Sequence, residues 1–290
     1  MMTTVEHWLQ GARPKTLYAA IAPVLVGTAF AGYNASLLHF FLALIVALSL
    51  QIGVNYANDY SDGIKGTDND RVGPIRLVAS GLAKPNTVRS AAFLSFALAG
   101  LAGLLLSYRT SWALIPIGLI SIAAAWGYTS GSKPYGYMGF GEVSVFIFFG
   151  VIATNGTYYV HVEEFSSQVL LASFALGALS CAILVLNNLR DLPKDAQVGK
   201  RTLAVIIGDA QSRDLYRWLI FFALVISAAL SIFSPYYLLA LISAPLAIKS
   251  VRSVKQGASG MELVDLLAKT GRIQIIYAAA LSLAALLVAR

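Results

Sequence analysis

The sequence predicts an all-α membrane protein, a bundle of nine transmembrane helices. Apolar residues make up 58% of the 290 residues, charged residues make up 12%, and the mean hydropathy of +0.71 is far above that of an ordinary soluble domain. Apolar windows of about 17 to 22 residues, the length that crosses ~30 Å of hydrocarbon, fit along the chain nine times. The windows are residues 17–33, 37–57, 88–107, 111–129, 139–160, 168–188, 215–233, 235–250 and 271–289.

The basic residues predict how this bundle is oriented. With nine spans, 19 of the 21 Lys and Arg residues fall on the side of the membrane that holds the N terminus. By the positive-inside rule, the N terminus and the long loops face the cytoplasm and the C terminus faces outside. We interpret the net charge of +7 as a topology signal that also attracts anionic membrane lipid. Because the chain has no basic patch interleaved with aromatic residues, we expect no nucleic-acid partner.

Two copies of an Asn-x3-Asp pattern, Asn58 to Asp62 and Asn187 to Asp191, lie where the second and sixth apolar windows end. The two copies are 129 residues apart at both the Asn and the Asp, which hints at a duplicated unit. Even-numbered helices all end on the cytoplasmic side, so both motifs are expected on one membrane face. A carboxylate near the hydrocarbon core is costly, by ~2.5 kcal/mol or more at mid-bilayer, so this cluster predicts a functional site.

The spacing within the motifs indicates the chemistry of this site. Residues four apart share one face of a helix, so Asn58 and Asp62 converge, as do Asn187, Asp191 and Asp195. Carboxylates ~6 Å apart repel by roughly 3 kcal/mol at an effective dielectric of ~20, so the cluster needs cations. Oxygen ligands without His or Cys favour Mg²⁺, which usually bridges to a substrate phosphate. The sequence therefore predicts a metal-bound diphosphate.

Two other interpretations of the motifs remain open at this point. The cytoplasmic loops hold about as many Lys and Arg as Asp, so ordinary salt bridges and Asx turns could account for either motif alone. A cation transporter also suits duplicated halves and membrane-embedded acids. Against a transporter, the acids lie at one face, and the apolar windows contain no charged relay across the bilayer.

Several strings in the chain resemble the UbiA superfamily of intramembrane prenyltransferases, and within it the branch that prenylates 1,4-dihydroxy-2-naphthoate in menaquinone (vitamin K2) synthesis. The strings include Arg13-Pro-Lys-Thr16, Asn58-Asp-Tyr-Ser-Asp62 with Gly66-Thr-Asp68, Gly139-Phe-Gly-Glu142, Asn187-Asn-Leu-Arg-Asp191 and Gly199-Lys-Arg-Thr-Leu203. The resemblance runs from Arg13 to about Arg272, so we expect one domain over residues 1–290. Its predicted parts are a cytoplasmic segment, 1–16, and two cytoplasmic loops, 58–87 and 189–214, that carry the motifs.

One departure from the common superfamily pattern separates the branches. The usual first motif has an Asp eight residues after its Asn, whereas this chain has Gly66 there and Asp68 two residues later. This form resembles the naphthoate branch and argues against the 4-hydroxybenzoate and haem branches. A UbiA-type enzyme that uses another aromatic acceptor, such as 4-hydroxybenzoate, remains the alternative enzyme.

The resemblance implies a Mg²⁺-dependent reaction in the cell inner membrane, with the active site facing the cytoplasm. A polyprenyl group leaves an allylic diphosphate and joins 1,4-dihydroxy-2-naphthoate, which loses its carboxylate to give a demethylmenaquinone. The implied catalytic and metal-binding residues are Asn58, Asp59, Asp62, Asp68, Asn187, Asp191 and Asp195. The candidate diphosphate contacts are Lys65, Lys133, Lys200 and Arg201; those for the acceptor carboxylate are Arg13, Lys15 and Arg76; and Tyr128 and Tyr135 are candidates to stabilise the allylic cation.

Overall fold

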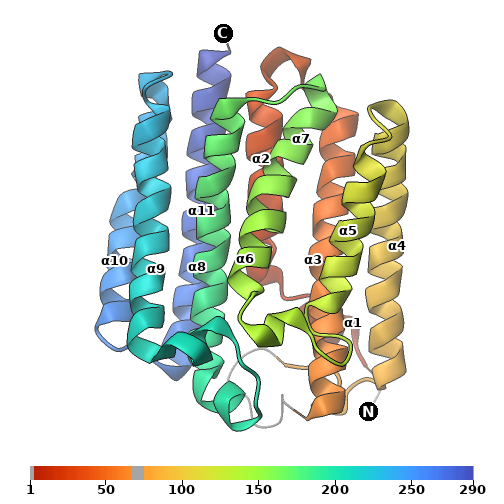
Figure 1. Cartoon of the computed structure of the whole chain (residues 1–290). Helices are drawn as coiled ribbons and strands as arrows, with labels where there is room; N and C mark the ends of the chain where they lie inside the picture. Colours follow the sequence, from red (N-terminus) through yellow and green to blue (C-terminus); the bar gives the residue numbers. More distant parts are fainter. Residues whose placement is uncertain (1–2, 67–74, 290) are drawn as a thin grey trace.

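The structure, a computed structural model, describes residues 3–66 and 75–289, and within these ranges all regular secondary structure is helical. Upright helices form a bundle, with the N terminus at one end and the C terminus at the other (Figure 1). The main elements are α1 (Val5–Gly11), α2 (Tyr18–Phe30), α3 (Leu37–Lys65), α4 (Pro85–Arg109), α5 (Leu114–Gly127), α6 (Gly141–Val145), the π-helical η4 (Phe146–Ile152), α7 (Ala153–Val162), α8 (Ser167–Gln197), α9 (Leu203–Leu230), α10 (Ala244–Lys255) and α11 (Gly260–Val288). Short 3₁₀ segments are η1 (Pro14–Thr16), η2 (Gly32–Asn34), η3 (Tyr135–Met138) and η5 (Pro235–Ser243).

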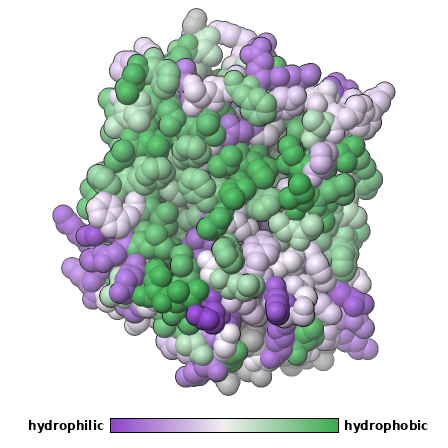
Figure 2. Space-filling model, in the orientation of Figure 1, coloured by the Kyte–Doolittle hydropathy of each residue, from purple (hydrophilic) through white to green (hydrophobic). Residues whose placement is uncertain are grey.

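The helices make this a multi-pass membrane protein. Within the described residues, six helical segments are long and apolar enough to cross a bilayer, and α2 and α5 are shorter apolar helices. Each of the nine predicted windows overlaps a helical segment. On the face in view, apolar residues form a broad band, and hydrophilic residues gather toward the two ends (Figure 2). Such a band matches the hydrocarbon layer of a bilayer.

Local sequence signals explain where α3 begins and ends and where α4 begins. Ser36 precedes α3, and its hydroxyl accepts a hydrogen bond from the backbone N–H of His39, which caps the first turn. Gly66 ends the helix in a left-handed conformation, with φ of 71°, that a residue with a side chain rarely adopts. Pro85 then stands at the first turn of α4, where its missing N–H costs nothing.

The helices that carry the motifs are longer than their apolar windows. We predicted that α3 would end at residue 57 and α8 at residue 188, but they continue to Lys65 and Gln197. Helix α9 likewise begins at Leu203, with a break at Gly208, and not at residue 215. The predicted loops 58–87 and 189–214 are therefore largely helical at their ends. Apolar length marks the membrane-embedded part of a helix, whereas backbone hydrogen bonding allows the helix to continue into polar sequence.

Helix α8 lies at the centre of the core and packs against α9, α11 and η4. Helix α8 and η4 approach closely at Gly150, where an added Cβ atom would lie 2.5 Å from Cα of Gly177. Small residues at such crossings let two helix backbones approach closely in a membrane. This crossing fixes η4 against α8 and so helps to shape the cavity described below.

This crossing gives a stability prediction. Gly150→Ala should destabilise the protein by ~1–3 kcal/mol because the added methyl group overpacks the crossing. Gly118→Ala, in α5, is the matched control, because the added methyl group meets no described atom within 4 Å. Thermal unfolding of both variants in detergent checks this. Equal melting temperatures for the two variants would contradict the close packing.

Candidate active site

A cavity of about 440 Å³ runs through the bundle between α2, α3, α4, α5, η4, α7 and α8. One end is lined by polar and charged side chains, namely Arg13, Asn58, Asp62, Arg76, Asn187 and Lys200. The remainder is lined mainly by apolar side chains, including Val24, Val46, Leu106, Ile117, Phe148 and Val160. The cavity can therefore hold a molecule with a charged head and a long apolar tail.

Helix α3 supplies one polar wall of the cavity. Gln51, Asn55, Asn58 and Asp62 all line it, and their spacing of four, three and four residues places them on one face of the helix. Asn58 accepts a hydrogen bond at Oδ1 from the hydroxyl of Thr129, with an O···O distance of 2.7 Å. Thr129 follows α5, so this bond ties the first motif to the connection between α5 and α6.

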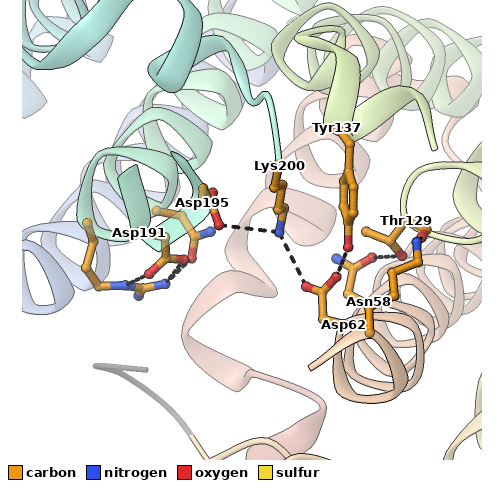
Figure 3. Close-up of polar contacts among 10 residues, drawn as sticks. Asn58, Asp62, Thr129, Tyr137, Asp191, Asp195 and Lys200 are labelled. Carbon is orange, nitrogen blue, oxygen red and sulfur yellow. Dashed lines mark hydrogen bonds and ion pairs between the residues drawn. The ribbon is translucent and has the colours of Figure 1, made fainter. Parts of the chain in front are cut away.

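The two motifs meet at Lys200, in the connection between α8 and α9 (Figure 3). Its Nζ lies 3.4 Å from Oδ2 of Asp62 and 3.9 Å from Oδ1 of Asp195. Both carboxylates are buried, with side-chain exposures of 3% and 8%. Buried charges of one sign need an opposite charge between them. The predicted convergence of the two motif helices is therefore present in the structure.

Tyr137, in η3, points its hydroxyl at Asp62 and donates a hydrogen bond to Oδ1 (Figure 3). Its ring lies between two ammonium groups, with Lys65 Nζ 4.7 Å and Lys200 Nζ 4.8 Å from the ring centroid. Lys65 also donates a hydrogen bond to the backbone carbonyl of Thr129 at 3.0 Å. A cation over an aromatic face is stabilised by the ring quadrupole. Tyr137 thus holds two basic side chains beside the carboxylate.

The second motif is organised by Arg190. The guanidinium forms two hydrogen bonds with Asp191, at 2.8 Å and 2.7 Å, and a third with Oδ1 of Asn187 at 2.8 Å. Arg190 and Asp191 are both buried, with side-chain exposures of 3% and 10%. A two-point arginine–carboxylate pair is among the stronger polar contacts in proteins. It fixes Asn187 and Asp191 on the same side of α8.

Asp59, Asp191 and Asp195 are not part of the cavity lining, and Asp59 differs from the other two in having both carboxylate oxygens held by backbone groups. Its two carboxylate oxygens accept hydrogen bonds from the backbone N–H groups of Leu77 and Val78, at 2.8 Å and 3.0 Å. The side chain is almost fully buried, with 1% exposure. Asp59 thus fixes the turn that carries Arg76 against α3, and we leave it out of the proposed metal ligands. Asp68, also predicted as a ligand, lies outside the described residues.

The predicted substrate contacts divide into two groups. Arg13, Arg76, Lys200, Tyr128 and Tyr135 line the cavity, and Lys65 lies beside it through Tyr137. By contrast, Lys15, Lys133 and Arg201 are exposed and are not part of its lining. Their positive charge suits the membrane surface, as expected for residues that set topology.

Tyr135, in η3, remains a neutral phenol. Burial raises the pKa of its hydroxyl, because a phenolate would lose its hydration. The Tyr135 hydroxyl lies 2.8 Å from the carbonyl oxygen of Ala124, to which it donates, and 2.9 Å from Ser144 Oγ. Tyr128 and Tyr135 both line the cavity, with their rings in an edge-on contact at 5.6 Å between centroids.

Residues 20–260 match the model of the UbiA prenyltransferase family. The chain belongs to this family. It is 49% identical over 283 residues to the 1,4-dihydroxy-2-naphthoate octaprenyltransferase of Mycobacterium tuberculosis, covering 97% of each chain. It is 44% identical to the enzyme of the same name from Mycobacterium leprae, covering 97% of this chain and 96% of the relative.

A solved structure shares the fold. The UbiA homolog from Archaeoglobus fulgidus, bound to DMAPP and Mg²⁺, aligns with a TM-score of 0.67 at 14% identity and covers 95% of this chain and 99% of the other. The similarity to this archaeal homolog concerns the fold. The chain is thus a UbiA-type prenyltransferase in a helical membrane fold.

The UbiA motif residues fit a divalent metal by the chemistry of their donors. Asn58, Asp62, Asn187, Asp191 and Asp195 offer amide and carboxylate oxygens, which hard cations prefer. Among residues 3–66 and 75–289, no three acidic, His or Cys side chains converge closely enough to hold one ion as they stand. Asp62 and Asp195 instead face Lys200, and Asp191 faces Arg190. A bound metal requires these cations to turn away from the carboxylates.

Residues that the sequence did not single out for the site include Thr129, Arg190, Gln51 and Asn55. The signal for Arg190 is its place within the second motif, between Asn187 and Asp191. Gln51 and Asn55 continue the four-three-four spacing upstream of Asn58, so the same helix-face argument could have found them. Thr129 carries no comparable pattern, because its role depends on tertiary contact with Asn58.

The different settings of Asp59 and Asp62 give a testable contrast. Asp59→Asn should lower the melting temperature whether or not Mg²⁺ is present, because an amide has only one oxygen to accept from the two N–H groups. It should keep the rise in melting temperature that Mg²⁺ and an unreactive prenyl thiodiphosphate produce together. Asp62→Asn should lose that rise. A ligand-dependent rise abolished in Asp59→Asn would contradict the assignment of Asp59 as a structural residue.

Proposed function

We propose that this protein transfers a polyprenyl group from an allylic diphosphate to 1,4-dihydroxy-2-naphthoate, with loss of CO₂, to give a demethylmenaquinone. The observation that carries the proposal is Lys200, which lines the polar end of a mainly apolar cavity and lies 3.4 Å from Asp62 and 3.9 Å from Asp195. The names of the mycobacterial relatives support the choice of acceptor. The Mg²⁺ and DMAPP bound to the archaeal homolog support the choice of metal and donor.

Asn58 and Asp62 on α3, with Asn187, Asp191 and Asp195 on α8, are the residues that would hold Mg²⁺. When bound, the metal neutralises diphosphate oxygens and so makes the diphosphate a better leaving group. The chain's own cations act on the same group. Lys200 and Lys65 lie on either side of the Tyr137 ring and can turn from it toward a diphosphate. Their positive charges stabilise the negative charge that builds up as the carbon–oxygen bond breaks.

The acceptor is held at the wall formed by the N-terminal segment and α3. Arg13 and Arg76 both line the cavity, and an arginine can grip a carboxylate at two points. The leaving diphosphate takes the electron pair of the broken carbon–oxygen bond, and a ring carbon supplies the pair that forms the new carbon–carbon bond. The carboxylate leaves as CO₂, and its electron pair returns to the ring system. The rings of Tyr128 and Tyr135 stabilise the allylic cation after the carbon–oxygen bond breaks and before the carbon–carbon bond forms.

The apolar part of the cavity accommodates the prenyl tail. Its lining includes Leu104, Ile117 and Leu119 from α4 and α5, which also reach the lipid-facing surface with exposures of 49%, 42% and 63%. An apolar passage of this kind lets a long tail continue from the cavity into the bilayer without exposing apolar surface to water. We further propose nine membrane crossings, with the N terminus and the polar end of the cavity on the cytoplasmic side of the inner membrane.

Purified protein in detergent should release diphosphate and form prenylated naphthoquinol when supplied with polyprenyl diphosphate, 1,4-dihydroxy-2-naphthoate and Mg²⁺. Chelation by EDTA should stop the reaction, and added Mg²⁺ should restore it. Asp62→Asn and Asp191→Asn should each reduce kcat by at least ~100-fold, because each removes a charge from the proposed metal site.

Asp214→Asn is the matched control. Asp214 lies on α9, where it is exposed and pairs with Lys255 at 2.7 Å, away from the cavity. This variant should keep wild-type turnover. A wild type that releases no diphosphate with both substrates and Mg²⁺ present would refute the proposal.

The acceptor is tested by exchange in the same assay. With 4-hydroxybenzoate in place of the naphthoate, we expect a drop in kcat/KM of at least ~10-fold, since the smaller ring loses apolar contact area. Equal or faster turnover of 4-hydroxybenzoate would move the assignment to the other UbiA branch while leaving the prenyltransferase chemistry intact.

A further inference from the structure

Arg13, which lines the polar end of the cavity, has an unusual backbone conformation. Its φ of 55° and ψ of 65° are left-handed, and among the described residues Glu163 is the only other non-glycine residue with a positive φ. A side chain in this conformation is crowded against its own backbone, and a residue before a proline, here Pro14, favours an extended conformation. Such strain persists only where the surrounding structure imposes it, and it is concentrated at functional sites.

Hydrogen bonds hold the peptide groups on both sides of Arg13. Asn55 donates from Nδ2 to the carbonyl oxygen of Ala12 at 2.9 Å. The hydroxyl and the backbone N–H of Thr16 both donate to the carbonyl oxygen of Arg13 at 2.9 Å, and the hydroxyl oxygen accepts from Gln51 Nε2 at 3.3 Å. Because peptide groups are planar, fixing the two that flank Arg13 fixes its φ and ψ. Thr16 and the polar face of α3 therefore impose the strained conformation.

Close packing leaves this segment little room to relax at either end. An added Cβ atom at Gly11 would lie 2.9 Å from Cδ1 of Leu77. At Gly271 of α11, an added Cβ atom would lie 2.8 Å from Cδ2 of Tyr18 and 3.2 Å from the carbonyl oxygen of Lys15. Residues 11–18 are therefore held against neighbouring elements at both ends, which is what a strained residue between them requires.

We propose that Thr16 and Asn55 are positioning residues, which hold Arg13 in its left-handed conformation so that it binds the carboxylate of the aromatic acceptor. This inference rests on the proposed function. The direction of a side chain depends on the backbone conformation of its residue. An Arg13 that relaxed to an extended conformation would therefore no longer direct its side chain to the same place. Gln51 acts one step further away, by holding the Thr16 hydroxyl.

The strain itself is tested by stability. Arg13→Gly and Arg13→Ala both remove the side chain beyond Cβ, but only glycine relieves the crowding of a left-handed backbone. Arg13→Gly should therefore melt at a higher temperature than Arg13→Ala in detergent. Equal melting temperatures, or a higher one for Arg13→Ala, would show that this position is not held left-handed and would overturn the inference.

Binding measurements test the positioning role. Dissociation constants for 1,4-dihydroxy-2-naphthoate and for 1,4-dihydroxynaphthalene, which lacks the carboxylate, are measured anaerobically in detergent without prenyl donor. The wild type should bind the naphthoate at least about tenfold more tightly, because arginine pairs with the carboxylate. Thr16→Val should lower this preference about fivefold, by weakening naphthoate binding alone, whereas Thr16→Ser keeps the hydroxyl and should retain the preference.

A double variant separates positioning from direct contact. In the Arg13→Gly protein no side chain is left to position, so adding Thr16→Val should cause no further loss of naphthoate affinity. The KM for the prenyl diphosphate should stay at its wild-type value in every variant. If Thr16→Val does not fold, Asn55→Leu tests the other flanking peptide group, with the same expected loss and the same dependence on Arg13.

Thr28→Val is the matched control for loss of a threonine hydroxyl. Thr28 lies in α2 outside the cavity lining, and its hydroxyl is 3.1 Å from Nε2 of His161. This variant should keep the full preference for the naphthoate.

The outcomes separate this inference from the function on which it rests. A wild type that prenylates the naphthoate, with Thr16→Val and Asn55→Leu variants that keep the preference, overturns the inference alone. Equal weakening of both ligands does the same, because it indicates a general disturbance of the pocket. A further loss in the Arg13→Gly protein also overturns it, because Thr16 then acts on the acceptor directly. A wild type that does not prenylate the naphthoate overturns both.

Discussion

The site depends on compensation of buried negative charge at the place where α3 and α8 approach each other. Asp62 and Asp195 come from motifs far apart in the sequence, and Lys200 lies between them. Without a cation between them, these two buried carboxylates would repel, and the helix ends would be pushed apart. Arg190 compensates Asp191 in the same way. Lys200, which lies between two of these carboxylates, also lines the cavity, so one side chain serves both the fold and the proposed reaction.

The rest of the structure supports this arrangement from the outside. The Gly150–Gly177 crossing fixes η4 against α8, and Asp59 fixes the turn that carries Arg76 against α3. Thr129 and Tyr137 bring the connection after α5 onto Asn58 and Asp62. The polar head of the cavity is thus built from several separate stretches of chain, while the apolar remainder needs only helix packing.

Helical periodicity allowed much of this to be predicted from the sequence. The spacing of Asn58 and Asp62, and of Asn187, Asp191 and Asp195, predicted two polar helix faces at one end of the bundle, and the resemblance predicted the family. Hydropathy could not predict that α3 and α8 extend past their apolar stretches, since it identifies residues that favour lipid and not residues whose backbone is helical. The sequence also could not show that Asp59 and Asp62 have different roles, because the partners of Asp59 are backbone groups 18 and 19 residues away. Lys200 and Lys133 are alike in sequence terms, and only the path of the chain places one of them in the cavity.

The central claim is that the two motif helices hold the same metal-bound diphosphate. Mn²⁺ in place of Mg²⁺ allows binding to be followed by electron paramagnetic resonance in the presence of an unreactive prenyl thiodiphosphate. Mn²⁺ affinity is then measured for the wild type, Asp62→Asn, Asp195→Asn and the double variant. If both side chains serve one site, each single change weakens Mn²⁺ binding and the losses are not additive in the double variant. Losses that add independently, or Mn²⁺ binding unaffected by either change, would contradict the account.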